Sequence, residues 1–260
     1  MSFFDSELFE QLRVAHGVTW GRPVRALEQC ASTNDLALEA VATDAKTGIV
    51  FLAREQTQGR GRRGNRWLAP AGECLTFSVL LRYPPGQTNV SGLSLATGLA
   101  ALDVVVARVP SPERVSFKWP NDVYVGDKKL CGVLIESKPD GQGHLGVVIG
   151  IGLNWLVSEF PPQLTRATSL ALQGAPAESL ESLLVDVLGQ LQLRVTQLLK
   201  NGVASLASEA CERDYLLGRN IQVENQRGVG AGIDAHGRLI LRNEQGRLHA
   251  ISAGHIEVSD

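Results

Sequence analysis

The feature that most limits the fold is a pair of long helix-like segments separated by a run of short strand-like ones. Apolar residues recur every three or four positions over 92–108 and again over 180–198, which predicts two helices with a core-facing side. Short apolar segments bounded by turn residues predict strands at 24–27, 49–53, 75–81, 115–118, 123–125, 129–136 and 145–150. Shorter helices are predicted at 5–16, from Ser32 onward and over 203–216. This irregular alternation favours an α/β fold of the α+β kind, with helices packed on a mixed or antiparallel sheet.

The segment after Gly218 has a different pattern. Apolar residues alternate with polar ones over short stretches, and residues 234–237 and 244–246 have the composition of turns. Several short strands in so short a segment are typical of a small β-barrel. We therefore predict two domains, a larger one over residues 1–212 and a small barrel over residues 213–260.

Charge and cysteine content argue against several classes of protein. The 25 Lys and Arg residues are outnumbered by 27 Asp and Glu residues, so a basic surface for nucleic acid is not expected. No apolar run approaches the length of a membrane span, and the N-terminus does not have the layout of a signal peptide. Cys30, Cys74, Cys131 and Cys211 lie far apart, which indicates reduced thiols in a cytoplasmic protein and argues against a structural zinc site.

Against this near-neutral background, one loop concentrates positive charge. Residues 59–67 read Gly-Arg-Gly-Arg-Arg-Gly-Asn-Arg-Trp, with four arginines and three glycines ahead of one aromatic residue. Glycine lets the backbone approach a ligand closely, and guanidinium groups bind phosphate and carboxylate oxygens. The loop therefore predicts a ligand that is anionic at one end and flat at the other, such as a nucleotide. A solvated basic turn is the competing interpretation.

A second polar segment, Lys-Trp-Pro-Asn-Asp at 118–122, leads through a turn into Lys-Leu-Cys-Gly at 129–132. Lysines in strands usually face solvent, and a buried lysine must be paired or partly discharged. We predict instead that Lys118 and Lys129 both face a polyanion. Asn121 and Asp122 supply oxygens of the kind that hold Mg²⁺ or its water shell. The alternative for Asp122 is to orient a neighbouring cation.

The order of these motifs resembles that of the biotin–protein ligases, also called biotin–[acetyl-CoA-carboxylase] ligases. The resemblance runs through residues 32–34, 56–67, 118–122, 129–132 and 150–154, and it covers nearly everything after about residue 25. It implies a class II synthetase-like catalytic domain followed by an SH3-like β-barrel. The segment before the first predicted strand is too short for a helix-turn-helix domain, so we expect a form that lacks the N-terminal DNA-binding domain.

The resemblance also implies which residues bind the substrates. Those for biotin are Ser32, Thr33, Asn34, Gln56, Arg60, Gly61, Arg62, Lys129 and Gly132. Those for ATP are Arg60, Arg62, Arg63, Trp67, Lys118, Asn121 and Asn154. The expected catalytic residues are Lys129, Arg62 and Lys118, and the expected metal ligand is Asp122.

Three of these motifs also have a simpler interpretation. Ser32 ahead of an apolar run is a typical helix N-cap, and Asn154 is also typical of a structural turn. Cys131 lies two residues from Lys129, which places both on one face of a regular strand. Such a pair suggests a thioester mechanism like that of the related lipoyl and octanoyl transferases, although we favour a small buried thiol.

The activity implied by the resemblance is an ATP- and Mg²⁺-dependent ligation in two steps. Biotin is first activated as biotinyl-5′-AMP and is then transferred to a lysine of the biotin carboxyl carrier protein. The alternative within the superfamily is a lipoate or octanoate protein ligase or transferase. From another class, the alternative is a biotin-sensing transcriptional repressor. Neither DNA nor a membrane is an expected partner, and both a monomer and a homodimer remain open.

Overall fold

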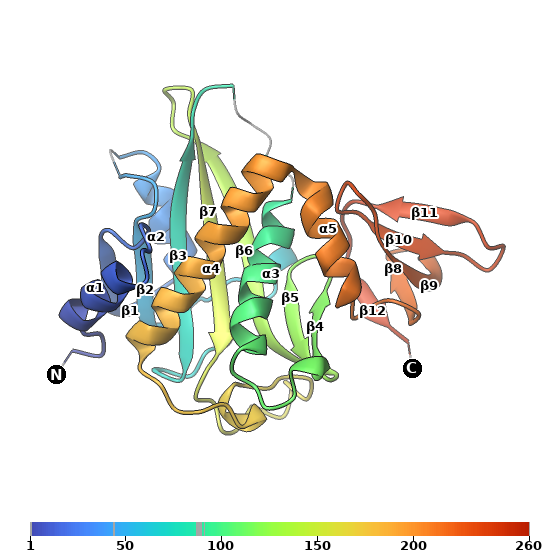
Figure 1. The fold of residues 1–260 in the computed structure, drawn as a ribbon, viewed down its shortest axis with the longest axis horizontal. Helices are drawn as coiled ribbons and strands as arrows, with labels where there is room; N and C mark the ends of the chain where they lie inside the picture. The colour runs from blue at the N-terminus through green and yellow to red at the C-terminus, as the bar shows by residue number, and fades with distance from the viewer. Residues whose placement is uncertain (1, 44, 87–89, 91, 260) are drawn as a thin grey trace.

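The computed structural model describes residues 2–43, 45–86, 90 and 92–259. Its centre is a seven-stranded sheet with the order β1-β2-β3-β7-β6-β5-β4 (Figure 1). β1 runs parallel to β2 and the other neighbouring pairs are antiparallel, so the prediction of a mixed sheet is confirmed. The strands are β1 (Val24–Cys30), β2 (Val50–Gln56), β3 (Cys74–Tyr83), β4 (Val115–Lys118), β5 (Asp122–Val125), β6 (Lys128–Pro139) and β7 (Leu145–Asn154).

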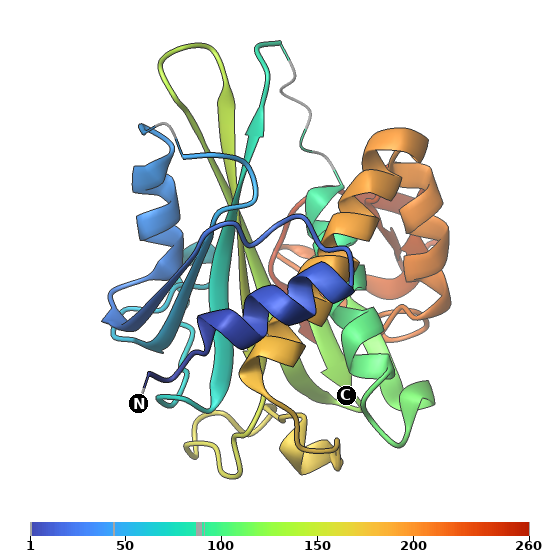
Figure 2. The same ribbon diagram turned by 60° about the vertical axis from the view of Figure 1, so that its left-hand side comes forward.

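Helices cover both faces of this sheet, and each face has its own apolar core (Figures 1 and 2). Because side chains alternate along a strand, Val50 and Leu52 of β2 enter the larger core whereas Phe51 enters the smaller one. The smaller core lies under α2 (Thr33–Ala40). The helices on the other face are α1 (Ser6–Ala15), α3 (Leu93–Val106) and α4 (Leu180–Asn201), and α5 (Val203–Glu212) packs beside α3 and α4.

The helix starts follow the predicted capping chemistry at α1 but not at α2. Asp5 caps α1, because its side chain accepts hydrogen bonds of 3.0 Å from two backbone N–H groups of the first turn. Ser32 occupies the N-cap position of α2, but its side chain makes no capping hydrogen bond. The N–H of Thr33 is bound instead by Gln56 Oε1 at 2.8 Å. Ser32 thus occupies the predicted N-cap position, but the predicted capping hydrogen bond of its hydroxyl is not formed.

β6 contains a β-bulge that changes which side chains share a face. Tyr124 of β5 pairs with Lys129, whereas Val123 pairs with Cys131, so Leu130 is an extra residue between them. Leu130 and Cys131 consequently both enter the larger core and are fully buried. The prediction that Cys131 shares a face with Lys129 is wrong, because the bulge interrupts the alternation between them.

Beyond α5 the chain enters a second, antiparallel sheet with the order β11-β10-β9-β8-β12. Its strands are β8 (Asn220–Val223), β9 (Gln226–Ile233), β10 (Leu239–Arg242), β11 (Leu248–Ile251) and β12 (Ile256–Val258). The outer strands of this order, β11 and β12, are not paired with each other in the described part of the chain. The sheet agrees with the expected small β unit, and the domain limits 1–212 and 213–260 remain a prediction.

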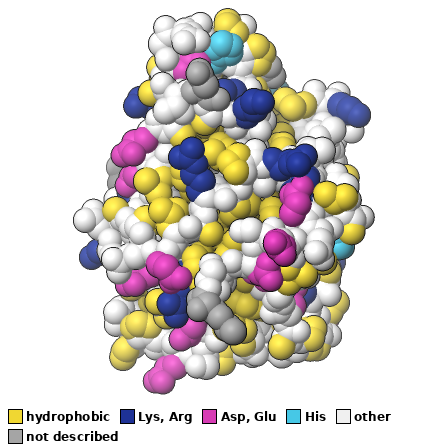
Figure 3. Space-filling view, turned by 90° about the vertical axis from the view of Figure 1, so that its left-hand side faces the viewer, with side chains coloured by type: hydrophobic (Ala, Val, Ile, Leu, Met, Phe, Trp, Pro, Cys, Tyr) yellow, Lys and Arg dark blue, Asp and Glu magenta, His cyan; other side chains and the backbone are white. Residues whose placement is uncertain are grey.

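One hydrogen bond joins the turn between β9 and β10 to the polar segment between β4 and β5. The indole Nε1 of Trp119, which is buried, donates to the Gly237 carbonyl at 2.8 Å. On the face seen in Figure 3, acidic and basic side chains are interspersed. Among the described residues, none of the helices is both long and apolar enough to cross a bilayer.

Candidate active site

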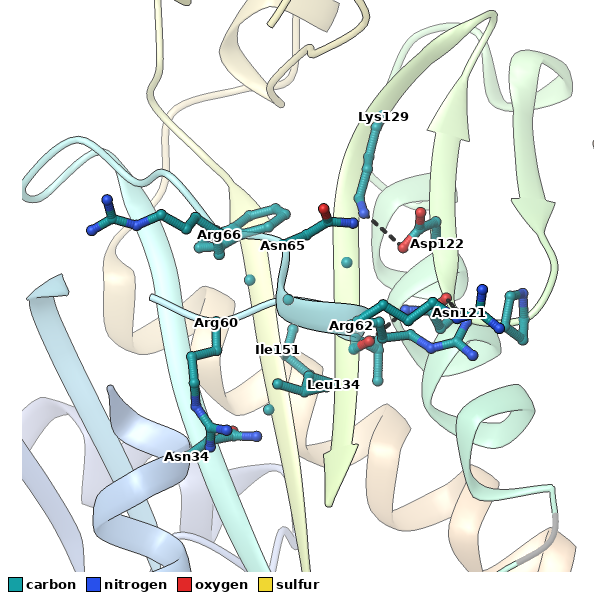
Figure 4. Close-up of a pocket in the computed structure, with 18 of the residues that line it drawn as sticks. Asn34, Arg60, Arg62, Asn65, Arg66, Asn121, Asp122, Lys129, Leu134 and Ile151 are labelled. Atoms are coloured by element: carbon teal, nitrogen blue, oxygen red, sulfur yellow. Dashed lines mark hydrogen bonds and ion pairs between the residues drawn. The ribbon is translucent and has the colours of Figure 1, made fainter. Parts of the chain in front are cut away.

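A pocket of about 280 Å³ lies where the glycine-rich loop crosses β6 and β7 (Figure 4). Of the residues predicted to bind biotin, ATP or a metal, all but Asn154 line it. They are Ser32, Thr33, Asn34, Gln56, Arg60, Gly61, Arg62, Arg63, Trp67, Lys118, Asn121, Asp122, Lys129 and Gly132. The structure therefore brings together side chains from α2, the loop and strands β4 to β6.

At one end, the floor of the pocket is a network of neutral hydrogen-bonding groups. Gln56 Oε1 accepts from the Thr33 N–H at 2.8 Å and from its hydroxyl at 3.1 Å, which leaves the Gln56 NH₂ group as a donor. The sequence did not single out Ser78, whose Oγ donates to Asn34 Oδ1 at 2.5 Å and lies 2.8 Å from Thr33 Oγ1. This end therefore suits a neutral ligand group that both donates and accepts hydrogen bonds.

Glu136 of β6 joins this floor to the glycine-rich loop, and the sequence did not single it out either. Its carboxylate accepts hydrogen bonds of 2.9 and 2.6 Å from Arg60 and one of 2.8 Å from Asn34 Nδ2. Asp35 lies 2.7 Å from the same guanidinium group. Arg60 points toward Asn34 (Figure 4), and two carboxylates balance its charge.

The indole of Trp67 lies in a trough where two neighbouring strands carry no side chain. Gly132 of β6 and Gly152 of β7 are paired across the sheet. A Cβ at Gly152 would lie 2.7 Å from Trp67 Cζ2 and Nε1, and one at Gly132 would lie 3.0 Å from Lys129 Nζ. Trp67 and Lys129 thus occupy the space that glycine leaves. The buried Nε1–H of Trp67 has no hydrogen-bond partner among the described residues, so it is a donor for a ligand.

Arg62 differs from Arg60 in what surrounds its charge. Its guanidinium donates to Asn121 Oδ1 at 3.1 Å, and within the described ranges it forms no ion pair. Burial lowers the pKa of Arg62, and the nearby Asp122 partly opposes this shift. Within the described ranges no carboxylate pairs with Arg62, so its positive charge remains available to an anionic ligand.

Lys118 and Lys129 lie on either side of Asp122. Asp122 pairs with Lys118 in the register of β4 and β5, and its carboxylate lies 2.8 Å from Lys129 Nζ. Lys118 Nζ lies 5.1 Å from the ring centre of Tyr124 and 5.9 Å from that of Tyr215. Burial lowers the pKa of Lys118, and Asp122 offsets part of the effect. The two ammonium groups are thus held by one carboxylate and an aromatic pair.

The donor set around Asp122 does not form a protein-held metal site. Its carboxylate is already paired with Lys129. In the part of the chain that the structure describes, no three His, Cys, Asp or Glu side chains are grouped so that they could hold a metal ion. Asp122 as a metal ligand stays a prediction, and the alternative, in which Asp122 orients a neighbouring cation, fits its contact with Lys129.

Two other predicted roles do not fit the pocket. Cys131 is fully buried, and burial raises its pKa to about 12, so the thiolate that a thioester mechanism needs does not form near neutral pH. Asn154 lies at the end of β7 outside the pocket, where its Nδ2 donates to the Thr168 carbonyl at 2.8 Å and its Oδ1 accepts from Cys74 Sγ at 3.6 Å. These contacts fit the structural interpretation of Asn154, and its adenine contact stays a prediction.

The C-terminal sheet supplies part of the pocket wall, which no motif indicated. Gly254, His255 and Ile256, at the start of β12, line the pocket. Arg63 of the loop lies 2.9 Å from Glu224, which follows β8. These contacts join segments far apart in the sequence, so a pattern of short alternating strands does not reveal them.

Comparison with known proteins places this pocket in a family. The sequence model of the biotin/lipoate A/B protein ligase family matches residues 26–154. The biotin–[acetyl-CoA-carboxylase] ligase of Mycobacterium tuberculosis is 34% identical over 97% of this chain and 94% of its own length. The chain belongs to the biotin protein ligase family.

Other biotin protein ligases are similar over most of the chain. The bifunctional ligase/repressor BirA of Escherichia coli is 29% identical over 86% of this chain and 70% of its own length. The biotin protein ligase of Aquifex aeolicus, solved in complex with biotin and ATP, has a TM-score of 0.77 at 26% identity and covers 92% of this chain and 99% of that one. The predicted fold class is thereby confirmed.

Proposed function

We propose that the protein is a biotin–[acetyl-CoA-carboxylase] ligase that uses ATP to form biotinyl-5′-AMP and then biotinylates a lysine of a biotin carboxyl carrier protein. The similarity to a relative of this activity along nearly the full length of both chains carries the conclusion. The pocket supports it, because one end has a neutral donor–acceptor floor and the other has Arg62, Lys118 and Lys129. Biotin has the same polarity, with a neutral cyclic urea at one end and a carboxylate at the other.

In the first step, a carboxylate oxygen of biotin attacks the α-phosphorus of ATP, the bond to the bridging oxygen breaks, and pyrophosphate leaves. Both reactants are anions, so their approach is opposed by charge repulsion. Lys118, Lys129 and Arg62 offset this repulsion, most strongly as charge builds in the transition state. Asp122 holds the Lys129 ammonium at 2.8 Å, and the Trp67 ring lies 5.7 Å from it, so the charge is already in place before the reactants arrive.

In the second step, the neutral amine of the acceptor lysine attacks the acyl carbon of the mixed anhydride. The bond between that carbon and the phosphate oxygen breaks, AMP leaves with the electron pair, and the amine releases a proton. Water competes with the amine for the same carbon. Trp67 of the glycine-rich loop packs against Gly152 and Gly132, and we propose that the loop keeps water away from the anhydride.

The remaining partners follow from the chemistry of this reaction. Mg²⁺ would neutralise charge on the ATP phosphates, and we propose that it arrives with ATP and keeps its water shell, since Asp122 is paired with Lys129. Four free cysteines support a reducing, cytoplasmic setting. The acceptors are biotin-accepting carrier domains, and the choice between monomer and homodimer remains a prediction.

The alternatives fit the geometry less well. A lipoate or octanoate group is apolar at the end where this pocket has the hydroxyl and amide groups of Thr33 and Gln56. Transfer through a thioester lacks an accessible thiol, because Cys131 is buried.

The proposal is tested by incubating the protein with ATP, Mg²⁺ and labelled biotin or lipoate, with and without a carrier domain. Biotin should yield a protein-bound adenylate and then a labelled carrier lysine, and lipoate should yield neither. Labelling of the carrier with lipoate alone would refute the proposal in favour of the superfamily alternative.

A further inference from the structure

We propose that Glu136 is a positioning residue that fastens the glycine-rich loop to the biotin end of the pocket. This inference rests on the proposed function, because it identifies what holds the loop over bound biotin and its adenylate. Glu136 lies on β6, and its one carboxylate joins two segments that are far apart in sequence. We call the contact between Arg60 and Glu136 the clasp.

The clasp has the geometry of a strong ion pair. Arg60 Nη1 and Nη2 donate to the two carboxylate oxygens at 2.9 and 2.6 Å, which is the fork-to-fork arrangement of a bidentate pair. The Arg60 side chain is 36% exposed and that of Glu136 is 26% exposed, so solvent screens the pair only partly. Asp35, 2.7 Å from Arg60, adds a second negative charge on the same side. Together these contacts hold the loop arginine in one orientation.

The other partner of Glu136 is fixed in place, so the clasp has a rigid side and a mobile side. Asn34 Nδ2 donates to Glu136, while Asn34 Oδ1 accepts from Ser78 of the buried strand β3. Gly150 of β7 leaves the space for this amide, since a Cβ there would lie 2.9 Å from Asn34 Cγ. Asn34 therefore cannot follow Glu136 to another position, and the loop is the part that moves when the clasp opens.

The clasp also gives different roles to Arg60 and Arg62, two of the three arginines that were predicted to bind ATP. The charge of Arg60 is balanced by Glu136 and Asp35, whereas Arg62 has a hydrogen bond to Asn121 and no ion pair in the described part of the chain. Arg60 therefore holds the loop in its closed position, and Arg62 is left to bind the anionic ligand. Loss of the clasp should let the adenylate leave early rather than prevent its formation.

The test uses the full-length protein with Glu136→Gln, which keeps the size of the side chain and removes its charge, together with Arg60→Ala and the double variant. Each is loaded with ATP, Mg²⁺ and labelled biotin in the absence of acceptor, and the release of adenylate is followed over time. The control is Glu28→Gln, which breaks the exposed Arg54–Glu28 pair (3.2 Å) between β1 and β2. The KM for biotin and the kcat for pyrophosphate release are measured alongside.

We expect Glu136→Gln to shorten the retention of adenylate by about tenfold, on the scale of a lost hydrogen-bonded charge pair. Arg60→Ala should have at least as large an effect, because it also removes the pair with Asp35. The double variant should be no worse than Arg60→Ala, because Glu136→Gln then has no clasp left to weaken. The KM for biotin should rise more than kcat falls. The control should behave like the wild type.

Retention equal to that of the wild type in Glu136→Gln, or fully additive effects in the double variant, would overturn the clasp. A wild-type protein that forms no adenylate at all would overturn the proposed function instead, so the two failures are distinguishable. If Glu136→Gln does not fold, as judged by its thermal melting curve, Arg60→Lys replaces it, because lysine keeps the charge and loses the bidentate geometry. Wild-type retention in Arg60→Lys would then overturn the clasp.

Discussion

The substitution Gly152→Ala tests whether the trough beneath Trp67 controls the glycine-rich loop. Gly152 lies in β7, between β3 and β6 in the interior of the sheet, so the backbone has little freedom to move away. The added methyl group would lie 2.7 Å from Trp67 Cζ2 and Nε1, well inside van der Waals contact. β7 is hydrogen-bonded to a strand on each side and cannot shift easily, whereas the loop can. The indole of Trp67 therefore has to leave the trough.

The size of the effect follows from the cost of overpacking. A forced methyl group in a tight site costs ~1–3 kcal/mol, and we assign this cost to closing the loop over Trp67. Because each 1.4 kcal/mol corresponds to a factor of ten, the ratio of closed to open loop should fall by about five- to a hundredfold. The melting temperature should change little, since the displaced side chain belongs to the loop.

Two measurements check this prediction, the KM for ATP and the rate at which trypsin cleaves at the loop arginines. Both should rise about fivefold or more in Gly152→Ala. The matched controls are Trp67→Ala and the double variant, in which the extra methyl group should add nothing. The reasoning is refuted if the single variant has the KM and cleavage rate of the wild type, or if Gly152→Ala is equally harmful without Trp67.

Three further predictions concern charged groups. Lys129→Ala should lower the rate of pyrophosphate release by an amount equivalent to ~3 kcal/mol, and a near-normal rate would remove Lys129 from the mechanism. Burial lowers the pKa of Lys118, so this lysine loses its charge at a lower pH than an exposed lysine does. Lys118→Arg should therefore move the alkaline decrease of kcat/KM for ATP to higher pH. A pH profile identical to that of the wild type would contradict this. Burial raises the pKa of Asp214 to about 6, so stability is lost as the pH rises through that value. Asp214→Asn should therefore increase the free energy of unfolding at pH 8 by ~1–2 kcal/mol, and by less as the pH falls, in urea titrations.

The helices and strands could be predicted because their local patterns agree with the final fold. The apolar spacing over 92–108 and 180–198 corresponds to α3 and α4, and the alternating segments correspond to strands of both sheets. The bulge at Leu130 could not be predicted in this way. Two adjacent apolar residues, Leu130 and Cys131, fit a regular buried strand equally well, and only the pairing with β5 shows that one of them is extra.

The candidate site could be predicted where its residues lie in recognisable motifs and not where they depend on sheet order. Ser78 and Glu136 lie in β3 and β6, which the order of the sheet places on either side of β7. Nothing in the sequence near Ser78 or Glu136 indicates that both side chains contact Asn34. Asn154 lies in a recognisable motif, yet its amide makes hydrogen bonds with Thr168 and Cys74 that the motif does not indicate.

Through the indole of Trp119, the C-terminal sheet supports the end of the pocket that contains Lys118 and Lys129. Trp119 follows Lys118 in the chain, and its Nε1 donates a hydrogen bond to the Gly237 carbonyl. Shortening the chain after α5 would leave a large aromatic ring without cover and its N–H without an acceptor, next to a lysine that the reaction needs. A truncated protein should therefore lose the alignment of Lys118 and Lys129, whereas the floor that we propose for biotin should stay intact.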